Sequence, residues 1–404
     1  MSARSIILTV FAAVVNGFKF LIYLGSIFIP RNDRIWIFTA GSGDRFAENT
    51  KYLFLKCESD ESIRNVWLTT NSEVHQQLTD AGYEVYHADS WAGRLLALRA
   101  GVFFRSHEPI LPEYSGRATL VQLSHGIYLK TIGYDNGNQR YDSVLEKLAG
   151  EWLINRRTHY AVTSMGPPAD LVESAFRIPR SRMLPTGFPR NDVLLRPIAD
   201  STLGIDTDSL DTVSAIHETH TTIFYTPTWR EAYGETNGIP LEELDLGFPA
   251  IDSLLGQHDA HLFVSVHPES TFDQDIDSME NISILDTGGD IYPFLSKCDV
   301  LVTDYSGIFY DFLLLDRPIV FYAPDLQAYE QSRGLYFEYE SHVPGPVAKS
   351  ATEFERTLEA VLSGQDAHAT DRASIRSSFF DDPDGSASDR VIRSMTFTRA
   401  GAYL

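Results

Sequence analysis

Cysteine is scarce in this sequence, and so are the short motifs that usually hold metals or phosphates. Its 404 residues include two cysteines, Cys57 and Cys298, which lie in apolar segments. Two such residues are too few for a disulfide framework or a zinc site, so a reducing compartment is the simpler inference. The His and carboxylate positions lack the short paired spacings of a ligand set, so no metal is expected. Glycine loops of the Walker or dinucleotide kind are also missing.

Basic residues are outnumbered as well. The chain has 33 Lys and Arg, of which seven are Lys, against 55 Asp and Glu, and its formal net charge is −22. Such a surface repels nucleic acid except at a local patch, so no nucleic-acid partner is expected. An acidic, lysine-poor surface suits a high-salt cytoplasm, where screening removes most self-repulsion. An ordinary acidic cytosolic protein is the alternative.

One long apolar run lies at the N-terminus, at residues 6–29. Its length could span a bilayer. Polar residues recur in it at helical spacings and form one stripe: Thr9, Asn16, Lys19, Tyr23 and Ser26. We therefore expect residues 1–33 to form an amphipathic helix that lies on a membrane surface, with a buried N-terminal helix as the alternative. No small-residue cleavage site follows, which argues against a cleaved signal peptide.

The rest of the chain alternates short apolar runs with helical patterns, and its 43% apolar content indicates a folded protein. The first predicted strands are Ile35–Phe38, Val66–Thr69, Glu84–Tyr86, Val102–Phe104, Leu120–Leu123, Tyr160–Thr163 and Met183–Thr186. The helices predicted among them are Phe46–Leu55, Ser72–Ala81, Trp91–Arg99 and Tyr141–Leu153. A second series has strands at Ile223–Tyr225, Leu262–Val266, Ile282–Leu285, Val300–Val302 and Ile319–Phe321, then helices at Thr352–Ser363 and beyond Thr370.

This alternation predicts two parallel-sheet α/β domains, at residues 34–200 and 201–404, that face each other across a cleft. The polar segment Pro197–Thr222 has little strand pattern and is the best boundary between them.

Polar motifs follow the ends of several predicted strands, where ligands bind in open parallel sheets. The motifs are Ser124-His125-Gly126, Gly187–Asp192, Thr226–Arg230, His267-Pro268 and Thr303–Ser306. His125 and His267 are the acid–base candidates, because imidazole titrates near neutral pH. A lone His after a strand is more often structural, but these two belong to opposite domains and could meet across the cleft.

The stretch Cys298–Tyr322 combines a strand, a turn, a helix and another strand. Ser306 can cap the helix, and Gly307 lets a ligand approach the backbone closely. Asp311 lies four residues later on the same helix face. Because a helix N-terminus attracts anions, this unit is a candidate ligand site, with an ordinary crossover as the alternative. Arg190 could pair with a phosphate in a bidentate way, or could mark the start of a surface helix.

Together these stretches resemble the CDP-glycerol glycerophosphotransferase family, the group of teichoic acid primases and polymerases. They are SHGIYLKTIGYD at 124–135, GFPRND at 187–192, YTPTWR at 225–230, VHP at 266–268 and DVLVTDYSGIFYDFLLLDRPIVFYAPDLQAYEQSRG at 299–334. The pentapeptide VPGPV at 343–347 also fits, and the similarity runs from about Arg34 to the C-terminus. It implies a GT-B-like fold of two Rossmann-like domains, attached peripherally to the cytoplasmic face of the membrane.

The resemblance also implies a reaction. Family members transfer glycerol phosphate, or ribitol phosphate in related branches, from a CDP-alditol to a hydroxyl of a membrane-linked glycan or polymer acceptor. CMP leaves, and no cofactor is involved.

By motif match, individual residues receive roles. His125 would deprotonate the acceptor hydroxyl, and the residues lining the same pocket would be Gly126, Ile127, Tyr128 and Leu129. The donor would be surrounded by Arg190, Pro227, Thr228, Arg230, His267, Ser306, Gly307 and Asp311. Of these, His267 and the Ser306-Gly307 turn would lie nearest its pyrophosphate.

The chain departs from the usual family pattern in two motifs. Ser124 stands where a Trp usually precedes the first His, and Ile127-Tyr128 replaces a Thr-Pro pair. Gly307 replaces the second Ser of the phosphate turn, which leaves the backbone donors intact. Acceptor and alditol identity are the properties that these departures affect.

Two other functions remain open. One is a nucleotide-sugar glycosyltransferase of the same architecture, which would attack an anomeric carbon. The other is a non-catalytic, nucleotide-binding scaffold at the membrane.

Overall fold

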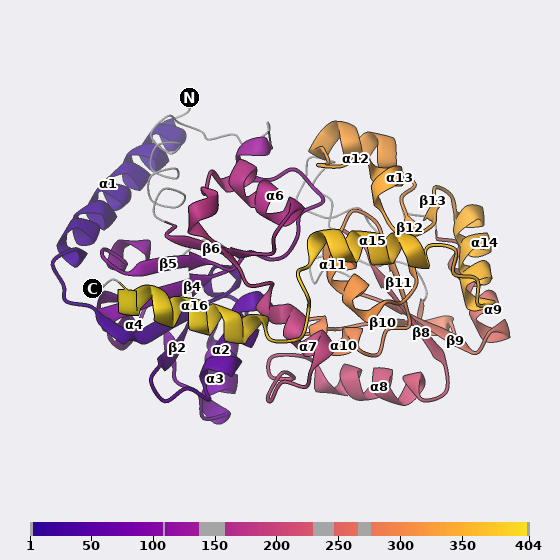
Figure 1. The fold of residues 1–404 in the computed structure, drawn as a ribbon, viewed down its shortest axis with the longest axis horizontal. Coiled ribbons are helices and arrows are strands. Elements are labelled where there is room, and N and C mark those ends of the chain that lie inside the picture. The colour runs from indigo at the N-terminus through magenta and orange to yellow at the C-terminus, as the bar shows by residue number, and fades with distance from the viewer. Residues whose placement is uncertain (1–2, 108–109, 137–157, 229–245, 266–275, 402–404) are drawn as a thin grey trace.

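Two parallel sheets organise the two halves of the molecule (Figure 1). The computed structural model describes residues 3–107, 110–136, 158–228, 246–265 and 276–401. The first lobe is built on the strands between residues 32 and 185, and the second lobe on those between residues 221 and 348. This arrangement confirms the predicted pair of parallel α/β domains.

The sheet of the first lobe has the strand order β3-β2-β1-β4-β5-β6-β7, and each pair is parallel. Its strands are β1 Asn32–Thr39, β2 Arg64–Thr69, β3 Val85–His87, β4 Ala100–Arg105, β5 Thr119–Gln122, β6 Tyr160–Thr163 and β7 Met183–Pro185. The second sheet has the order β10-β9-β8-β11-β12-β13, again parallel. Its strands are β8 Thr221–Thr226, β9 Ala260–Val264, β10 Ile282–Ile284, β11 Val300–Thr303, β12 Ile319–Tyr322 and β13 Val347–Ala348.

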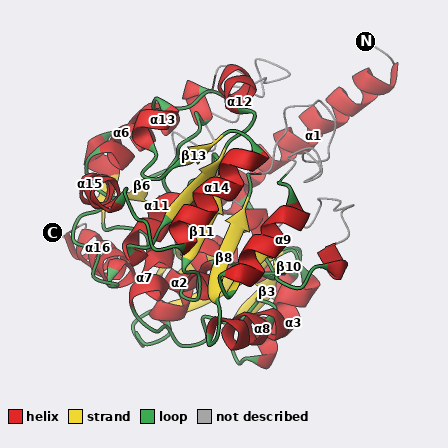
Figure 2. Cartoon of the chain, turned by 90° about the vertical axis from the view of Figure 1, so that its right-hand side faces the viewer, coloured by secondary structure: helices red, strands yellow, loops and turns green. Residues whose placement is uncertain are grey.

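Helices lie on both faces of the sheets, as the second view shows (Figure 2). The longer helices are α1 Ala3–Ser26, α2 Glu48–Cys57, α3 Ser72–Asp80, α4 Trp91–Arg99, α6 Pro167–Phe176, α8 Thr207–His217, α9 Phe248–Gln257, α12 Leu326–Arg333, α14 Ala351–Leu362, α15 Ala369–Phe379 and α16 Ala387–Gly401. The shorter helices are α7 Asp192–Leu195, α10 Tyr292–Leu295, α11 Ile308–Phe312 and α13 Tyr339–His342. Two turns of 3-10 helix, η2 Pro112–Tyr114 and η6 Pro189–Asn191, pack against them.

Alternate residues of each strand enter different hydrophobic cores, because successive side chains of a strand point to opposite faces. In β11, Leu301 belongs to the core that contains Phe309 of α11. Its neighbours Val300 and Val302 belong to the core that contains Phe354 of α14. Burial on both faces explains why these strands are continuous apolar runs in the sequence.

A buried contact joins the two lobes beneath the cleft. Lys51 of α2 places its ammonium nitrogen 2.8 Å from a carboxylate oxygen of Asp290, and the Tyr52 hydroxyl donates to the same oxygen at 2.8 Å. The side chains of Lys51 and Asp290 are 0% and 1% exposed, so neither charge is hydrated. Tyr52 also packs edge-on against Tyr292 of the second lobe.

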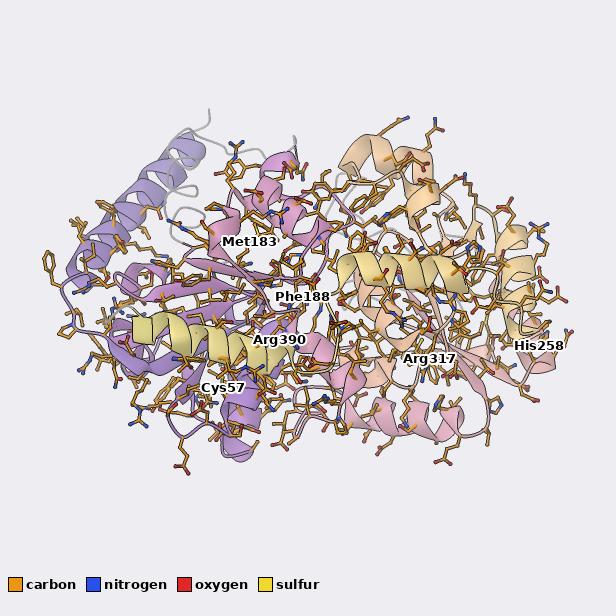
Figure 3. The ribbon with its side chains drawn as sticks, viewed as in Figure 1. Cys57, Met183, Phe188, His258, Arg317 and Arg390 are labelled. Atoms are coloured by element: carbon orange, nitrogen blue, oxygen red, sulfur yellow. The ribbon has the colours of Figure 1, made fainter. Side chains whose placement is uncertain are left out.

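The C-terminal helix α16 returns to the first lobe, although the division at residues 200 and 201 grouped it with the second. The backbone amides of Ala387 and Ser388 each donate to the Asp192 carboxylate at 2.8 Å. Arg390 donates to the carbonyl of Thr186 at 2.8 Å. Figure 3 shows Arg390 on α16 and Phe188 at the junction of the lobes.

The N-terminal helix α1 projects from the first lobe and is fixed to it at its C-terminal end (Figures 1 and 2). Arg31 donates to the carbonyls of Ser26, Ala97 and Tyr114 at 3.1, 2.9 and 2.9 Å. Ser26 is buried and accepts a hydrogen bond from the Gly116 amide at 3.0 Å. Among the described residues, no helix has both the length and the hydropathy of a membrane span.

Several local predictions differ from the structure. The polar segment Pro197–Thr222 contains helix α8, and the helix after Ser306 begins at Ile308 and has five residues. Gly307 is the N-cap of that helix, and the Ser306 hydroxyl accepts only a 3.4 Å contact from the Ile308 amide. The predicted helix Tyr141–Leu153 lies outside the described residues.

We expect the variant Lys51→Met to destabilise the protein strongly, because it leaves the Asp290 charge buried without its cation. Loss of one partner of a buried ion pair costs about 3–5 kcal/mol. The matched control is Lys56→Met on the same helix, whose partner Asp389 is exposed; there the expected cost is below about 1 kcal/mol. Urea unfolding of both variants measures the difference, and equal midpoints would show that the Lys51 contact has no special weight.

Candidate active site

A cavity of about 280 Å³ lies between the two lobes. It brings together predicted site residues from both of them: His125, Ile127, Tyr128, Leu129, Arg190, Ser306 and Gly307. The topology accounts for this meeting, since His125 follows the carboxyl end of β5 and Ser306 follows the carboxyl end of β11.

The loop that carries His125 is held by an amide side chain from α2. Ser124 has a left-handed backbone, with φ 59°, which turns the chain sharply before His125. The Asn49 side chain donates to the carbonyls of Leu123 and Ser124 at 3.1 and 2.8 Å. Its oxygen accepts the Arg190 amide at 3.0 Å. Asn49 therefore fixes two site loops relative to each other.

Arg190 bridges the lobes. Its guanidinium donates to the His125 carbonyl and to the buried Asp311 carboxylate, and it lies 4.8 Å from the centre of the Tyr292 ring. Tyr292 also donates its hydroxyl to Asp311 at 2.7 Å. Burial opposes the charge of Arg190, but Asp311, Tyr292 and Glu48 together outweigh burial and hold the Arg190 pKa above its ordinary value.

Two predicted residues lie behind the cavity wall because of this bridge. Asp311 is 0% exposed and contacts Arg190, not the cavity. Gly126 lies under the guanidinium, where a Cβ atom would be 2.0 Å from an Arg190 nitrogen. With φ at +121°, Gly126 also has a backbone that other residues rarely adopt.

His125 lies in the wall of the cavity, and its exposed surface faces that space. Its ring stacks on His107, with ring centres 4.9 Å apart, and meets Tyr128 edge-on at 5.1 Å. Partial desolvation between the lobes, followed by the nearby charge of His107, lowers the pKa of His125. The imidazole is therefore neutral near pH 7 and can accept a proton.

The wall on the side of the second lobe depends on Gly307. A Cβ atom at this position would lie 2.3 Å from the carbonyl oxygen of Ile127. The backbone angles of Gly307 are ordinary, so the close approach of the other lobe is what excludes a side chain. The Ile127 carbonyl therefore leaves no room for a side chain at position 307.

Pro227 and Thr228 follow the end of β8 and lie outside the cavity lining. The buried Asp304 carboxylate accepts the Thr228 amide at 2.8 Å and so fixes this loop beside the turn at Ser306. His267 and Arg230 are outside the described residues. The expected meeting of His125 with His267 stays a prediction.

The sequence reasoning missed part of the cavity lining, namely Lys130, Ile132, Tyr292, Ile308 and Arg333. Most of these residues lie inside the quoted motif stretches, which is the signal that was available. The described lining contains Lys130, Arg190 and Arg333 but no Asp or Glu. A protein with net charge −22 thus has a locally basic cavity, as anions require.

A strap of backbone hydrogen bonds closes one edge of the cavity between Leu129–Ile132 and Arg333–Tyr336. The Thr131 amide donates to the Gly334 carbonyl at 3.1 Å, and the Tyr336 amide donates to the Leu129 carbonyl at 2.9 Å. The two segments belong to different lobes, so the strap holds Lys130 and Arg333 on the same side of the cavity.

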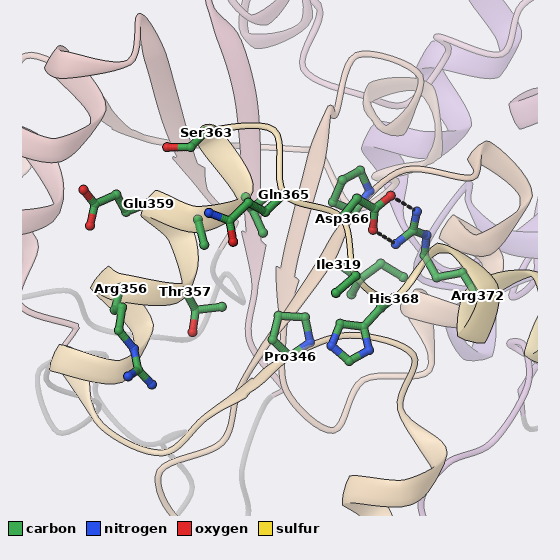
Figure 4. A pocket seen from close by; sticks show the side chains of 14 residues that line it. Ile319, Pro346, Arg356, Thr357, Glu359, Ser363, Gln365, Asp366, His368 and Arg372 are labelled. Atoms are coloured by element: carbon green, nitrogen blue, oxygen red, sulfur yellow. Dashed lines mark hydrogen bonds and ion pairs between the residues drawn. The ribbon is translucent and has the colours of Figure 1, made fainter.

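A second cavity, of about 590 Å³, lies in the second lobe beside α14 and α15 (Figure 4). It includes Ile319, the first residue of β12, and therefore lies at the amino ends of the strands. Its buried Arg372 is already paired with Asp366 through two hydrogen bonds, at 2.7 and 2.5 Å. None of the motif residues singled out above as site candidates lines it.

No group of three or more His, Cys, Asp or Glu side chains in the described ranges is arranged to hold a metal ion.

Two parallel α/β lobes with a basic cavity at the carboxyl ends of their strands form the architecture of a GT-B-type transferase. The family model for CDP-glycerol:poly(glycerophosphate) glycerophosphotransferase matches residues 21–396, and the chain therefore belongs to this family of enzymes.

Named relatives agree with this assignment. A teichoic acid glycerol-phosphate transferase of Staphylococcus aureus is 25% identical over 379 residues, which cover 91% of this chain and 94% of that one. A teichoic acid ribitol-phosphate primase of Bacillus spizizenii is 26% identical and covers 86% and 87% of the two chains. The structure of the wall teichoic acid polymerase TagF superposes with a TM-score of 0.78 at 21% identity, over 99% of this chain and 98% of that chain, and shows the fold.

We expect Gly307→Ser to impair this enzyme. The added Cβ would push Ile127 and the His125 loop away from the second lobe, and misplacement of about 1 Å in an active site lowers rates by about a hundredfold. Steady-state turnover measures the loss. Gly25→Ala in α1 is the control, because no heavy atom lies within 4 Å of its added Cβ. Turnover of Gly307→Ser equal to that of the control would contradict the assigned role of the close approach.

Proposed function

We propose that this enzyme transfers an alditol phosphate, most simply glycerol phosphate, from a CDP-alditol to a hydroxyl of a lipid-linked glycan or polymer acceptor. The observation that carries the proposal is one basic cavity containing a neutral His125 from the first lobe and the Ser306-Gly307 turn from the second. The names of the two relatives support either glycerol or ribitol as the alditol.

In the proposed reaction, the acceptor oxygen attacks the phosphorus that carries the alditol. A new P–O bond forms to the acceptor. The bond between the attacked phosphorus and the bridging oxygen breaks, and CMP leaves with that oxygen. His125 takes the proton of the attacking hydroxyl. Such transfers need in-line positioning and stabilisation of phosphoryl charge, and Lys130 and Arg333 supply positive charge at the cavity.

A donor panel tests the proposal. With acceptor present, we expect CMP release from CDP-glycerol or CDP-ribitol and no nucleotide release from UDP-N-acetylglucosamine. Release from the nucleotide sugar alone would favour the glycosyltransferase alternative. Binding of the CDP-alditols without turnover would favour the scaffold.

His125→Ala should lower CMP release by about 10²–10⁴-fold, the usual contribution of a positioned general base. His258→Ala, at the far end of the second lobe in Figure 3, is the matched control and should leave turnover unchanged. Wild-type turnover in His125→Ala would remove the proposed base from the mechanism.

We also propose that α1 rests on the cytoplasmic face of the membrane, where a lipid-linked acceptor is located. Phe18 and Leu21 of α1 are each 64% exposed, and Phe28, in the turn after the helix, is 84% exposed. Lys19 is exposed as well and suits anionic headgroups. Tyr23 and Ser26, which end the polar stripe, are buried against the first lobe. The apolar face of this part of the helix therefore points away from the protein.

The triple variant Phe18→Glu, Leu21→Glu, Phe28→Glu should remain in the supernatant when sedimented with anionic vesicles, because the inserted charges cannot enter the lipid interface. Its donor turnover with a water-soluble acceptor should be unchanged. Ile284→Glu, a change at a 42% exposed residue of β10, is the control and should still bind vesicles. Sedimentation of the triple variant with vesicles would refute the role of α1.

A further inference from the structure

His107 covers one face of the proposed catalytic base. It follows β4, and β4 is the neighbour of β5, which leads to His125. The two imidazole planes are 14° from parallel, with ring centres 4.9 Å apart. Stacked rings at this distance restrict rotation of each other, so His107 defines one side of the space that the His125 ring occupies.

The position of His107 is itself fixed. Its Nδ1 lies 3.2 Å from a carboxylate oxygen of Glu48 and 3.2 Å from the Ser106 hydroxyl. Arg105 donates to the His107 carbonyl at 3.1 Å. Glu48 has a left-handed backbone, with φ 65°, which residues with a side chain rarely adopt. This strained residue therefore starts α2 with its carboxylate directed at His107.

His125 is oriented differently from the base of a Ser-His-Asp triad, in which a carboxylate hydrogen-bonds to the imidazole. Within the described ranges, no carboxylate accepts a hydrogen bond from a ring nitrogen of His125. Its ring contacts the face of His107 and the edge of Tyr128. In this site the carboxylate of Glu48 contacts His107, and His107 in turn contacts His125.

We propose that His107 and Glu48 are positioning residues for His125: Glu48 holds a positively charged His107, whose ring fixes the plane of the His125 ring. The inference rests on the proposed function, in which His125 is the base. His107 is not among the described residues that line the cavity, so we assign it a role through His125.

The charged groups around His125 determine in which direction its pKa moves when His107 is replaced. His107 faces it from the loop after β4, Arg190 from η6 and Lys130 from its own loop, and each lowers its pKa, whereas Glu48 of α2 raises it. Tyr128 is neutral near pH 7 because burial raises its pKa to about 12. Tyr292 and Arg333 line the same cavity from the second lobe.

The Glu48 carboxylate is well suited to hold His107 protonated. Burial opposes the charge of Glu48, but the contact with His107, the further charge of His125 and the Ser106 hydroxyl together lower its pKa to about 2. Glu48 is therefore favoured as an anion beside His107.

The variant His107→Phe separates charge from shape, because it keeps an aromatic ring on His125 and removes the positive charge. We expect its acid limb of kcat/KM against pH, measured as CMP release from CDP-glycerol, to move upward by about one pH unit or more. Its plateau should stay within about threefold of wild type. His107→Ala loses ring and charge together, so its acid limb should move upward and its plateau kcat should fall about tenfold with KM unchanged.

The control is His258→Phe, far from the cavity, which should leave both limb and plateau unchanged. An acid limb that stays in place in His107→Phe would overturn the proposal. If that variant is inactive, histidine ring NMR of the folded full-length chain decides instead: the His125 titration must still move upward, and an unmoved titration overturns the inference. Failure of this inference can be distinguished from failure of the proposed function. Unimpaired turnover of His125→Ala would reject His125 as the base. An inactive His125→Ala together with an unmoved acid limb in His107→Phe would reject only the positioning role of His107 and Glu48.

Discussion

The buried ion pair between Arg190 and Asp311 is the constraint on which the site depends. Arg190 belongs to the first lobe and Asp311 to helix α11 of the second, so the pair forms only in one arrangement of the lobes. Desolvation of two charges cancels much of their attraction, so the pair is weak evidence for stability, but loss of one partner would leave a buried charge unpaired. Because Arg190 also donates to the His125 carbonyl, the interaction that joins the lobes places the proposed base.

The distribution of charge follows a related logic. The molecule is strongly acidic, yet three cationic side chains and no described carboxylate line the cavity. The carboxylates near the site, Asp290, Asp304 and Asp311, are buried in contacts with Lys51, the Thr228 amide and Arg190. The buried acidic groups thus hold the site loops in place by contacts outside the cavity. The basic groups line the space where a phosphorylated ligand is proposed to bind.

Much of the fold could be predicted from sequence, because strands buried on both faces are continuous apolar runs with turn residues at their ends. Helix α4 was predicted with its observed bounds, Trp91–Arg99. Helix α8 was missed because its apolar residues, Leu210, Val213 and Ile216, are few among Asp, Thr and Ser. The two-residue strand β13 has no periodicity that a sequence could display.

The site could be predicted in part. His125, Arg190 and Ser306, which the motifs at strand ends singled out, line one cavity, and their roles in it stay predictions. Sequence could not show that Asp311 contacts Arg190 and not the cavity, because that depends on the approach of two lobes. The reason for Gly307 was equally hidden, since the neighbour that excludes a side chain is a backbone carbonyl 180 positions earlier in the chain. His107 follows a predicted strand as the other motif residues do, but its closeness to His125 follows only from the order of β4 and β5.

The strap between Leu129–Ile132 and Arg333–Tyr336 has a consequence for motion. The amide hydrogens of Thr131 and Tyr336 are each bonded to a carbonyl of the opposite lobe, so they become available to solvent deuterium when the lobes part. The hydrogen-exchange rates of these two amides therefore report how often the cleft opens, without the need for any substrate.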